Sequence, residues 1–322
     1  MIPQLKPNPT FKGEIATHTS LIFEKGSRLV YGTSGLGGVW GQVEQEESID
    51  CLLYAFEQGI TSLDTSPSYH KAEEYVGKAL ARWQGATPFI STKVGRLPAE
   101  KADECYVDYS PKSMQNSLMR SLDRMKVERV DLLFLHEPQL VPLEQLDEII
   151  DTLQKFKAEG YTKMLGVGGN PTDAFRPYIG GKFDVVSGFL KLDACNLSAF
   201  EKDIPYLKQH NIAYYAASAL HMGLLGNRFE SYVKNPPDSA WISREDIEAA
   251  KAVHEIARRN ELNLSSLAQR YLFSIQEADR IVMGARKIEQ IEATITDWQQ
   301  GALPKEIFEE VSQAIIAHRY NR

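Results

Sequence analysis

Leu132-Leu133-Phe134-Leu135-His136 is an apolar run that closes on one ionisable residue. Two earlier runs have the same form, since Phe89-Ile90-Ser91-Thr92-Lys93 closes on a lysine and Ser62-Leu63-Asp64 closes on an aspartate. Short, mostly apolar runs bounded by turn residues are typical of buried strands. Each ionisable side chain is therefore expected where a strand ends, and adjacent parallel strands would bring all three to one edge of a sheet.

The rest of the chain repeats this pattern, because short apolar segments alternate with longer amphipathic ones. Eight strand-like segments can be counted, and each is expected to lead into a helical segment. Eight such units in 322 residues favour a closed (β/α)8 TIM barrel, an α/β fold, over an open sheet. The expected strands are Arg28–Tyr31, Ser62–Asp64, Phe89–Thr92, Val130–Leu135, Met164–Val167, Asp184–Ser187, Ala213–Ala216 and Arg280–Met283.

No Gly/Ser-rich linker or change of composition divides the chain, so residues 1–322 are expected to form one domain, with 1–18 as an irregular lead. Ser20–Glu24 and Arg28–Tyr31 flank a Gly-containing turn and predict a β-hairpin that caps the bottom of the barrel. Insertions at Pro98–Pro111 and Gly226–Ile242 should lie at the opposite end, where barrels place their active sites. The expected helices are Glu47–Gln58, Lys71–Ala81, Lys112–Arg124, Leu143–Ala158, Phe200–Gln209, Arg244–Asn260, Ser265–Leu272, Ile288–Trp298 and an extra C-terminal helix near Lys305–His318.

Composition narrows the function classes. The net charge is -7 and basic residues are scattered among acidic ones, so a nucleic-acid partner is not expected. Three widely spaced cysteines suggest no disulfide framework, and no apolar run is long enough for a signal peptide or a membrane span. We therefore expect a cytoplasmic protein, a monomer or small homo-oligomer, that acts on a small molecule.

Asp64, Lys93 and His136, together with Tyr69 just after the second strand, form a candidate catalytic group. A phenol has a pKa of about 10 and is a poor acid or base at neutral pH. A nearby ammonium group favours the phenolate, a carboxylate keeps that ammonium charged, and an imidazole can orient a substrate oxygen. Each residue alone is more simply explained by a turn cap, packing or a solvated strand end. Together they favour carbonyl reduction or alcohol oxidation.

From about Gly32 to Thr294 the chain resembles the aldo-keto reductase family. This resemblance implies a (β/α)8 barrel that binds NADPH or NADH without a Rossmann fold. The resemblance implies that Tyr69 is the general acid/base, that Lys93 and Asp64 adjust its pKa, and that His136 orients the substrate. The stretches that match are Gly32–Gly38, Leu63–Tyr69, Ser91–Lys93, Arg129–His136 and Met283–Gln290.

The resemblance also implies a cofactor site across the barrel mouth. Several positions depart from the family pattern, notably Ala217 in place of a stacking tyrosine and the stretch Gly166–Asn170 in place of a Ser-Asn pair. Arg286 and Lys287 permit a 2′-phosphate, so the choice between NAD and NADP stays open. The residues expected at the cofactor are Gly32, Thr33 and Ser34; Gly168, Asn170 and Ser187; Ser218, Leu220, Gly223 and Leu225; and Gly284, Ala285, Arg286, Gln290 and Thr294.

The stretch Ala217–Leu225 is similar to the branch of sugar dehydrogenases that act on L-galactose, L-fucose or D-threo-aldoses, which oxidise the anomeric carbon to a lactone. We expect Trp40, Tyr106, His221 and Trp241 to bind the substrate, although ordinary packing explains each alone. A nucleotide-binding regulatory subunit of the same fold is the alternative. No His-x-His pair or similar ligand motif is present, so no metal site is expected.

Overall fold

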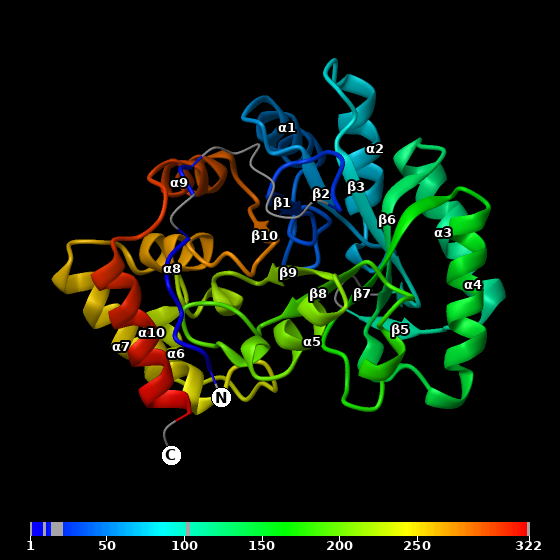
Figure 1. The fold of residues 1–322 in the computed structure, drawn as a ribbon. Coiled ribbons are helices and arrows are strands. Elements are labelled where there is room, and N and C mark those ends of the chain that lie inside the picture. The colour runs from blue at the N-terminus through cyan, green and yellow to red at the C-terminus, as the bar shows by residue number, and fades with distance from the viewer. Residues whose placement is uncertain (1, 9–10, 14–21, 101–103, 321–322) are drawn as a thin grey trace.

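Eight parallel strands form a closed barrel in this computed structural model, which describes residues 2–8, 11–13, 22–100 and 104–320 (Figure 1). The strands follow the order β1-β10-β9-β8-β7-β6-β3-β2 around the barrel. This confirms the (β/α)8 prediction and all eight expected strands. The strands are β1 (Leu29–Gly32), β2 (Ser62–Asp64), β3 (Phe89–Val94), β6 (Val130–His136), β7 (Thr162–Gly168), β8 (Val185–Phe189), β9 (Ala213–Ala217) and β10 (Arg280–Gly284).

Helices surround the barrel, so the strands are covered on both faces. All residues of β3 and β6 are buried, which explains why neither strand alternates between polar and apolar residues and why β6 is mostly apolar. The C-terminal helix α10 packs against α7. The helices are α1 (Gln45–Glu57), α2 (Ala72–Arg82), α3 (Pro111–Met125), α4 (Leu146–Ala158), α5 (Asp203–Gln209), α6 (Phe229–Lys234), α7 (Arg244–Arg259), α8 (Leu264–Phe273), α9 (Ile288–Gln299) and α10 (Lys305–Arg319).

Local capping explains why two of these helices begin where they do. Ser110 caps α3 by accepting a hydrogen bond from the Ser113 amide, and proline occupies the first helical position. Ser243 and Asp246 form a capping box at the start of α7. The nine expected helices are confirmed, whereas the short α6 was not expected. Between β7 and β8 the structure has only the 3-10 turn η4 (Arg176–Tyr178) and no α-helix.

The inside of the barrel is a packed core. Its bottom holds Arg280, whose guanidinium lies 3.9 Å from the Phe23 ring centroid and 4.1 Å from that of Phe89. Arg280 Nη1 also donates to the Tyr215 hydroxyl at 3.0 Å. These contacts close the lower end, so the upper end, where the strands finish, is the open one. The interior cluster consists of Phe23, Val30, Phe89, Leu132, Phe134, Val185, Ala213 and Tyr215.

The predicted N-terminal hairpin is wrong within the described residues. Residues 20 and 21 lie outside them, and residues 22–28 form a turn and bends without a strand. Ser27 bonds to the neighbouring barrel strand, because its carbonyl accepts from Ser62 Oγ at 2.8 Å and its Oγ accepts from the Thr61 amide at 3.0 Å. The segment therefore caps the bottom through Phe23 and not through a hairpin.

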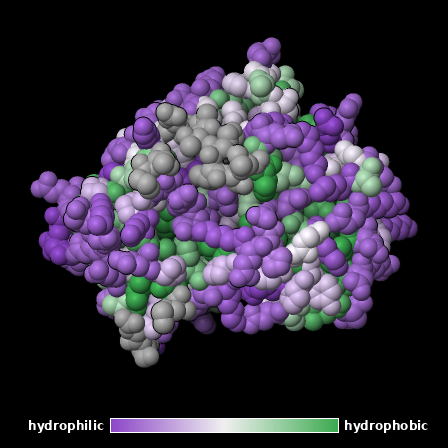
Figure 2. Space-filling view, in the orientation of Figure 1, coloured by the Kyte–Doolittle hydropathy of each residue, from purple (hydrophilic) through white to green (hydrophobic). Residues whose placement is uncertain are grey.

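An antiparallel hairpin occurs elsewhere, in the insertion that follows β3. It pairs β4 (Arg96–Pro98) with β5 (Cys105–Val107). One face of the molecule is largely hydrophilic with smaller hydrophobic areas (Figure 2). Among the described residues, every helix is too short or too polar to cross a bilayer. The extent of the domain stays a prediction.

Candidate active site

A buried ion pair lies at the ends of β2 and β3. Lys93 Nζ is 2.6 Å from Asp64 Oδ2 and also donates to the Thr65 carbonyl at 2.8 Å. Ser91 Oγ donates to the other carboxylate oxygen, Asp64 Oδ1, at 2.9 Å. The carboxylate is thus held on both sides, and the ammonium group is fixed at the carboxyl end of the barrel.

Tyr69 stands beside this ammonium group. It belongs to the 3-10 turn η1 (Pro67–Tyr69), whose first residue is a proline and whose cap, Ser66, accepts from the Ser68 amide. Lys93 Nζ lies 4.7 Å from the centroid of the tyrosine ring. The turn therefore brings the phenol back over the end of β3.

His136, the last residue of β6, completes the group. Its ring is nearly perpendicular to that of Tyr69, with centroids 6.2 Å apart. Nδ1 lies 3.4 Å from Ser66 Oγ, and the His136 carbonyl accepts from the Tyr109 hydroxyl at 2.8 Å. The structure thus brings together all four residues predicted as catalytic.

The surroundings set the protonation states of these groups. Burial, with Lys93 and Arg96 adding to it, holds the pKa of His136 well below its ordinary value, so the imidazole is neutral. Burial opposes the charge of Lys93, but Asp64 and Tyr69 raise its pKa above the ordinary value. Burial also raises the pKa of Tyr69, and Asp64 adds to this effect while Lys93 acts against it. At neutral pH the site holds a phenol that can donate a proton.

Sequence reasoning missed several groups that support this site. Ser91 orients the carboxylate, Tyr109 fixes the backbone at His136, and Arg96 Nη1 lies 3.1 Å from Glu137 Oε1. Ser91 carried a signal, because it lies two residues before Lys93 on the same face of the strand. Tyr109 and Arg96 carried none, since both belong to the inserted segment or its edge.

Two of the predicted substrate residues meet at the barrel mouth. The rings of Trp40 and Trp241 are 6.4 Å apart and nearly perpendicular, and Phe189 lies 6.1 Å from Trp241. The two tryptophans are 45% and 49% exposed, which leaves ring surface free for a ligand. Tyr106 is 54% exposed and lines a separate cavity between α3 and the β4–β5 hairpin. The substrate contacts themselves stay predictions.

His221 does not fit its predicted role as a substrate residue. It is fully buried, with Nδ1 2.7 Å from Asp193 Oδ2 and Nε2 3.4 Å from Asp246 Oδ2. Burial lowers its pKa, but Asp193 and other partners reverse this and hold the pKa well above the ordinary value. The ligand atoms of Asp193, Cys195 and His221 lie within 4.8 Å of one another, a spacing that the His221–Asp193 ion pair already explains. His221 therefore acts as a buried cation inside the protein.

The loop after β9 carries four of the predicted cofactor residues. Ser218 and Gly223 have left-handed backbone, with φ of 72° and 90°, and both are partly exposed, as is Leu220. Leu225 is different, because its side chain is fully buried in the core and its amide donates to the Leu220 carbonyl at 3.1 Å. Leu225 is thus placed to support the loop and not to contact a ligand.

The remaining predicted cofactor residues lie in or after the barrel strands, except Gln290 and Thr294, which belong to α9. Asn170 uses its amide group to bind both backbone groups of Phe189, at 2.8 and 3.0 Å. Thr294 is buried, and its hydroxyl lies 2.9 Å from Gln269 Oε1, so it offers little to a ligand. The others end or follow their strands, namely Gly32, Thr33 and Ser34 after β1, Gly168 in β7, Ser187 in β8, and Gly284, Ala285 and Arg286 after β10.

The start of α9 has the features of an anion site. Lys287 caps this helix without a side-chain bond to its amides, so no side chain of the cap residue covers the first turn. Arg286 and Lys287 are exposed there, and nothing lies within 4 Å of where a Cβ on Gly284 would stand. Arg286 Nη1 donates to the Trp40 carbonyl at 3.1 Å, which holds the side chain near the mouth. These donors and this space fit the phosphate groups of a dinucleotide.

Comparison with known proteins agrees with this geometry. The chain is 30% identical to L-galactose dehydrogenase of Arabidopsis thaliana over 91% of both chains. It is 28% identical to D-arabinose 1-dehydrogenase of Saccharomyces cerevisiae, over 80% of this chain and 78% of the relative. The solved glycerol dehydrogenase of Gluconobacter oxydans has the same fold, with a TM-score of 0.74 at 24% identity over 96% of this chain and 97% of that one. Residues 28–316 match the model of the aldo/keto reductase family, and the chain is a member of this family of oxidoreductases.

Proposed function

We propose that this aldo-keto reductase transfers a hydride between a nicotinamide cofactor and a sugar carbon, oxidising an aldose at its anomeric carbon to a lactone. The observation that supports it most is the buried Lys93–Asp64 pair beside Tyr69, with the neutral His136 on the other side. Members of the family generally use NADPH or NADH. A bound nicotinamide supplies or accepts the hydride.

The roles of the four side chains follow from their charges. Oxidation of an aldose needs Tyr69 as the phenolate, which forms when the phenol releases its proton to solvent and which the charge of Lys93 stabilises. This phenolate then takes the proton of the anomeric hydroxyl. Asp64 keeps Lys93 charged and in place. His136 is neutral, so it can bind the same oxygen by a hydrogen bond without competing for its proton. In the reverse direction Tyr69 donates the proton to a carbonyl oxygen.

For the cofactor, the start of α9 with Arg286 and Lys287 would hold phosphate groups, and the partly exposed loop residues Ser218 and Gly223 would lie along the cofactor. The choice of an aldose rests on the relatives. L-galactose dehydrogenase and D-arabinose 1-dehydrogenase act on sugars, as does the D-threo-aldose 1-dehydrogenase of Pseudomonas, which is 24% identical over 82% of this chain. The pair of tryptophans at the mouth supports this choice, because aromatic rings suit the apolar faces of sugars.

The experiment is a panel of aldoses assayed with NAD and NADP by the absorbance of the reduced cofactor. L-galactose, L-fucose and D-arabinose are tested, and the matching alditols serve as controls because they lack an anomeric hydroxyl. We expect turnover of at least one aldose, none of its alditol, and a lactone product that hydroxylamine traps. Equal turnover of alditols, or reduction of simple aldehydes with no aldose oxidation, would remove the sugar assignment.

A further inference from the structure

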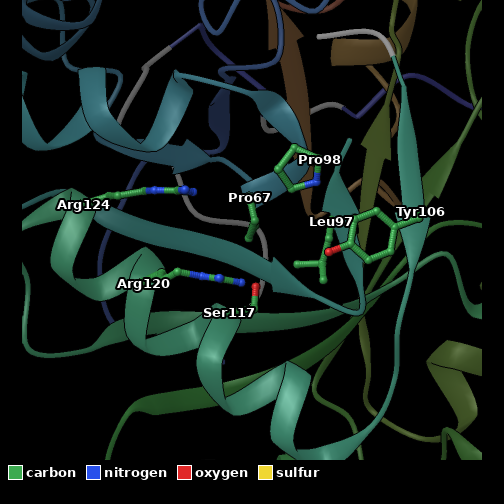
Figure 3. Close-up of a pocket in the computed structure, with 7 residues that line it drawn as sticks. All are labelled: Pro67, Leu97, Pro98, Tyr106, Ser117, Arg120 and Arg124. Atoms are coloured by element: carbon green, nitrogen blue, oxygen red, sulfur yellow. The ribbon is translucent and has the colours of Figure 1, made fainter. Parts of the chain in front are cut away.

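The cavity lined by Tyr106 lies beside the candidate active site, between α3, the β4–β5 hairpin and the start of η1. Its volume is about 130 Å³. Neither Lys93 nor His136, two of the four candidate catalytic residues, lines this cavity. The cavity is therefore separate from the candidate active site. It is lined by Pro67, Leu97, Pro98, Tyr106, Ser117, Arg120 and Arg124 (Figure 3).

Two guanidinium groups give this cavity a positive wall. Arg120 and Arg124 are four residues apart on α3 and extend in the same direction, toward the side of Pro67 and Leu97 (Figure 3). Like charges at this spacing repel each other. Arg124 Nη1 lies 3.3 Å from the fully buried Glu73 carboxylate, whereas Arg120 makes no ion pair or hydrogen bond within the part of the chain that the structure describes. Arg120, which is exposed to solvent, thus lines the cavity without a carboxylate partner within that part of the chain.

A buried hydroxyl lies in the same wall. Ser117 is 1% exposed, and its Oγ has no hydrogen-bond partner among the described residues. A buried polar group without a partner is costly, and such groups usually meet a ligand or water. Ser117 precedes Arg120 by one helical turn, so its hydroxyl and the guanidinium lie on the same side of α3.

We propose that this cavity binds a small phosphate-type oxyanion, either inorganic phosphate or the phosphate group of a small ester. Guanidinium groups bind such anions with two parallel hydrogen bonds, and the hydroxyl of Ser117 adds a third donor. One water occupies roughly 30 Å³ of liquid, so the cavity has room for a tetrahedral anion and an accompanying water. Pro67 and Leu97 line the wall opposite the two arginines.

The position of the cavity links a bound anion structurally to the candidate active site. Pro67 begins the turn that carries Tyr69, and Cys105 Sγ of the hairpin lies 3.9 Å from the Ser68 carbonyl. An anion held by α3 touches both the hairpin and this turn. It therefore stabilises the segment that presents Tyr69, as an effector and not as the substrate.

The test measures binding of inorganic phosphate and of glycerol 3-phosphate to the full chain by calorimetry, at constant ionic strength. Each titration is made with and without saturating NADP. Phosphate that binds at the start of α9 should no longer bind when NADP is present, whereas phosphate in the cavity should still bind. The variants are R120Q and S117A. R129Q is the matched control, because Arg129 is exposed, just beyond α3 and outside the cavity.

We expect saturable binding that NADP leaves in place, weakened about tenfold or more in R120Q and several-fold in S117A, and unchanged in R129Q. Tighter binding of inorganic phosphate identifies the free ion as the ligand, and tighter binding of the ester identifies a metabolite. No saturable binding, equal binding by wild type and R120Q, or complete competition by NADP would overturn the proposal. Because no arm measures turnover, its failure is separate from that of the proposed reaction.

Discussion

Two buried clusters at the carboxyl end of the barrel each contain a histidine, and one histidine is neutral whereas the other is positively charged. The pKa of His136 is well below its ordinary value because it is buried near the cations Lys93 and Arg96. The pKa of His221 is well above, because Asp193 and its other partners outweigh the effect of burial. The neighbours, and not the residue type, decide what each histidine can do.

The two clusters also differ in access. The cluster around His136 is open, because it includes the partly exposed Tyr69, which can exchange a proton with a ligand. The second is closed, and it joins the loop after β9 to the start of α7 and, through Arg319 bound to Asp246, to α10. That loop has left-handed backbone at Ser218, His221 and Met222, which costs about 1–3 kcal/mol for each residue and persists only where the surroundings hold it. The closed cluster therefore holds a strained loop, and the open cluster around Tyr69 is the one that we propose as catalytic.

The largest effect is expected from Lys93→Met, which removes the charge that stabilises the phenolate. We expect kcat to fall about 10²- to 10⁴-fold, while the circular dichroism spectrum stays native. Lys6→Met is the matched control, since Lys6 is exposed, and its kcat should stay near that of the wild type. A kcat of the Lys93 variant within about threefold of the wild type would mean that the open cluster is not the site of proton transfer.

His221→Gln should mainly affect stability. It leaves the buried Asp193 without its cation and Asp246 with Arg319 alone, and breaking a buried ion pair costs about 3–5 kcal/mol. His136→Gln should cost less stability but far more activity. Urea unfolding measures the stability of each variant, and kcat at low temperature measures its activity. A larger stability loss in His136→Gln, with a larger activity loss in His221→Gln, would contradict the roles assigned to the two histidines.

The smallest effect is the pH dependence of these two contributions to stability. The contribution of His221 is complete below the unfolded pKa of 6.5 and is lost as pH rises through the higher folded pKa. For His136 the folded pKa is lower than 6.5, so its contribution is present above that pH and is lost as pH falls. The free energy of unfolding is measured for the wild type and for each glutamine variant from about pH 5 to about pH 9. The difference between wild type and variant should fall with pH for His221 and rise with pH for His136. Parallel slopes would contradict the assigned charges.

Much of the fold and of the catalytic group could be predicted from the sequence. Strands buried on both faces, such as β3 and β6, produce apolar runs that end on their polar residues, so both the barrel and the positions of Lys93 and His136 are readable. Tyr69 follows from Pro67, which fixes the turn. These features depend on local sequence and on the rule that parallel strands end together.

The remainder depended on contacts between distant segments. Ser27 bonds to the neighbouring strand instead of closing a hairpin, which no local pattern reveals. The burial of His221 requires Asp193 and Asp246, which are 28 and 25 residues away in the chain. The local sequence around a polar residue in a loop at the barrel mouth does not distinguish a side chain that faces a ligand from one that faces a buried carboxylate. Such residues can be assigned only once the partners are placed.

The central claim is that the phenol of Tyr69 transfers the proton at the open cluster. The most direct test is Tyr69→Phe, with turnover and the dissociation constant of the nicotinamide cofactor measured on the same preparation. We expect turnover to fall by about 10²-fold or more while cofactor affinity stays unchanged, because only the hydroxyl is removed. Turnover close to that of the wild type, with the cofactor bound normally, would contradict the claim.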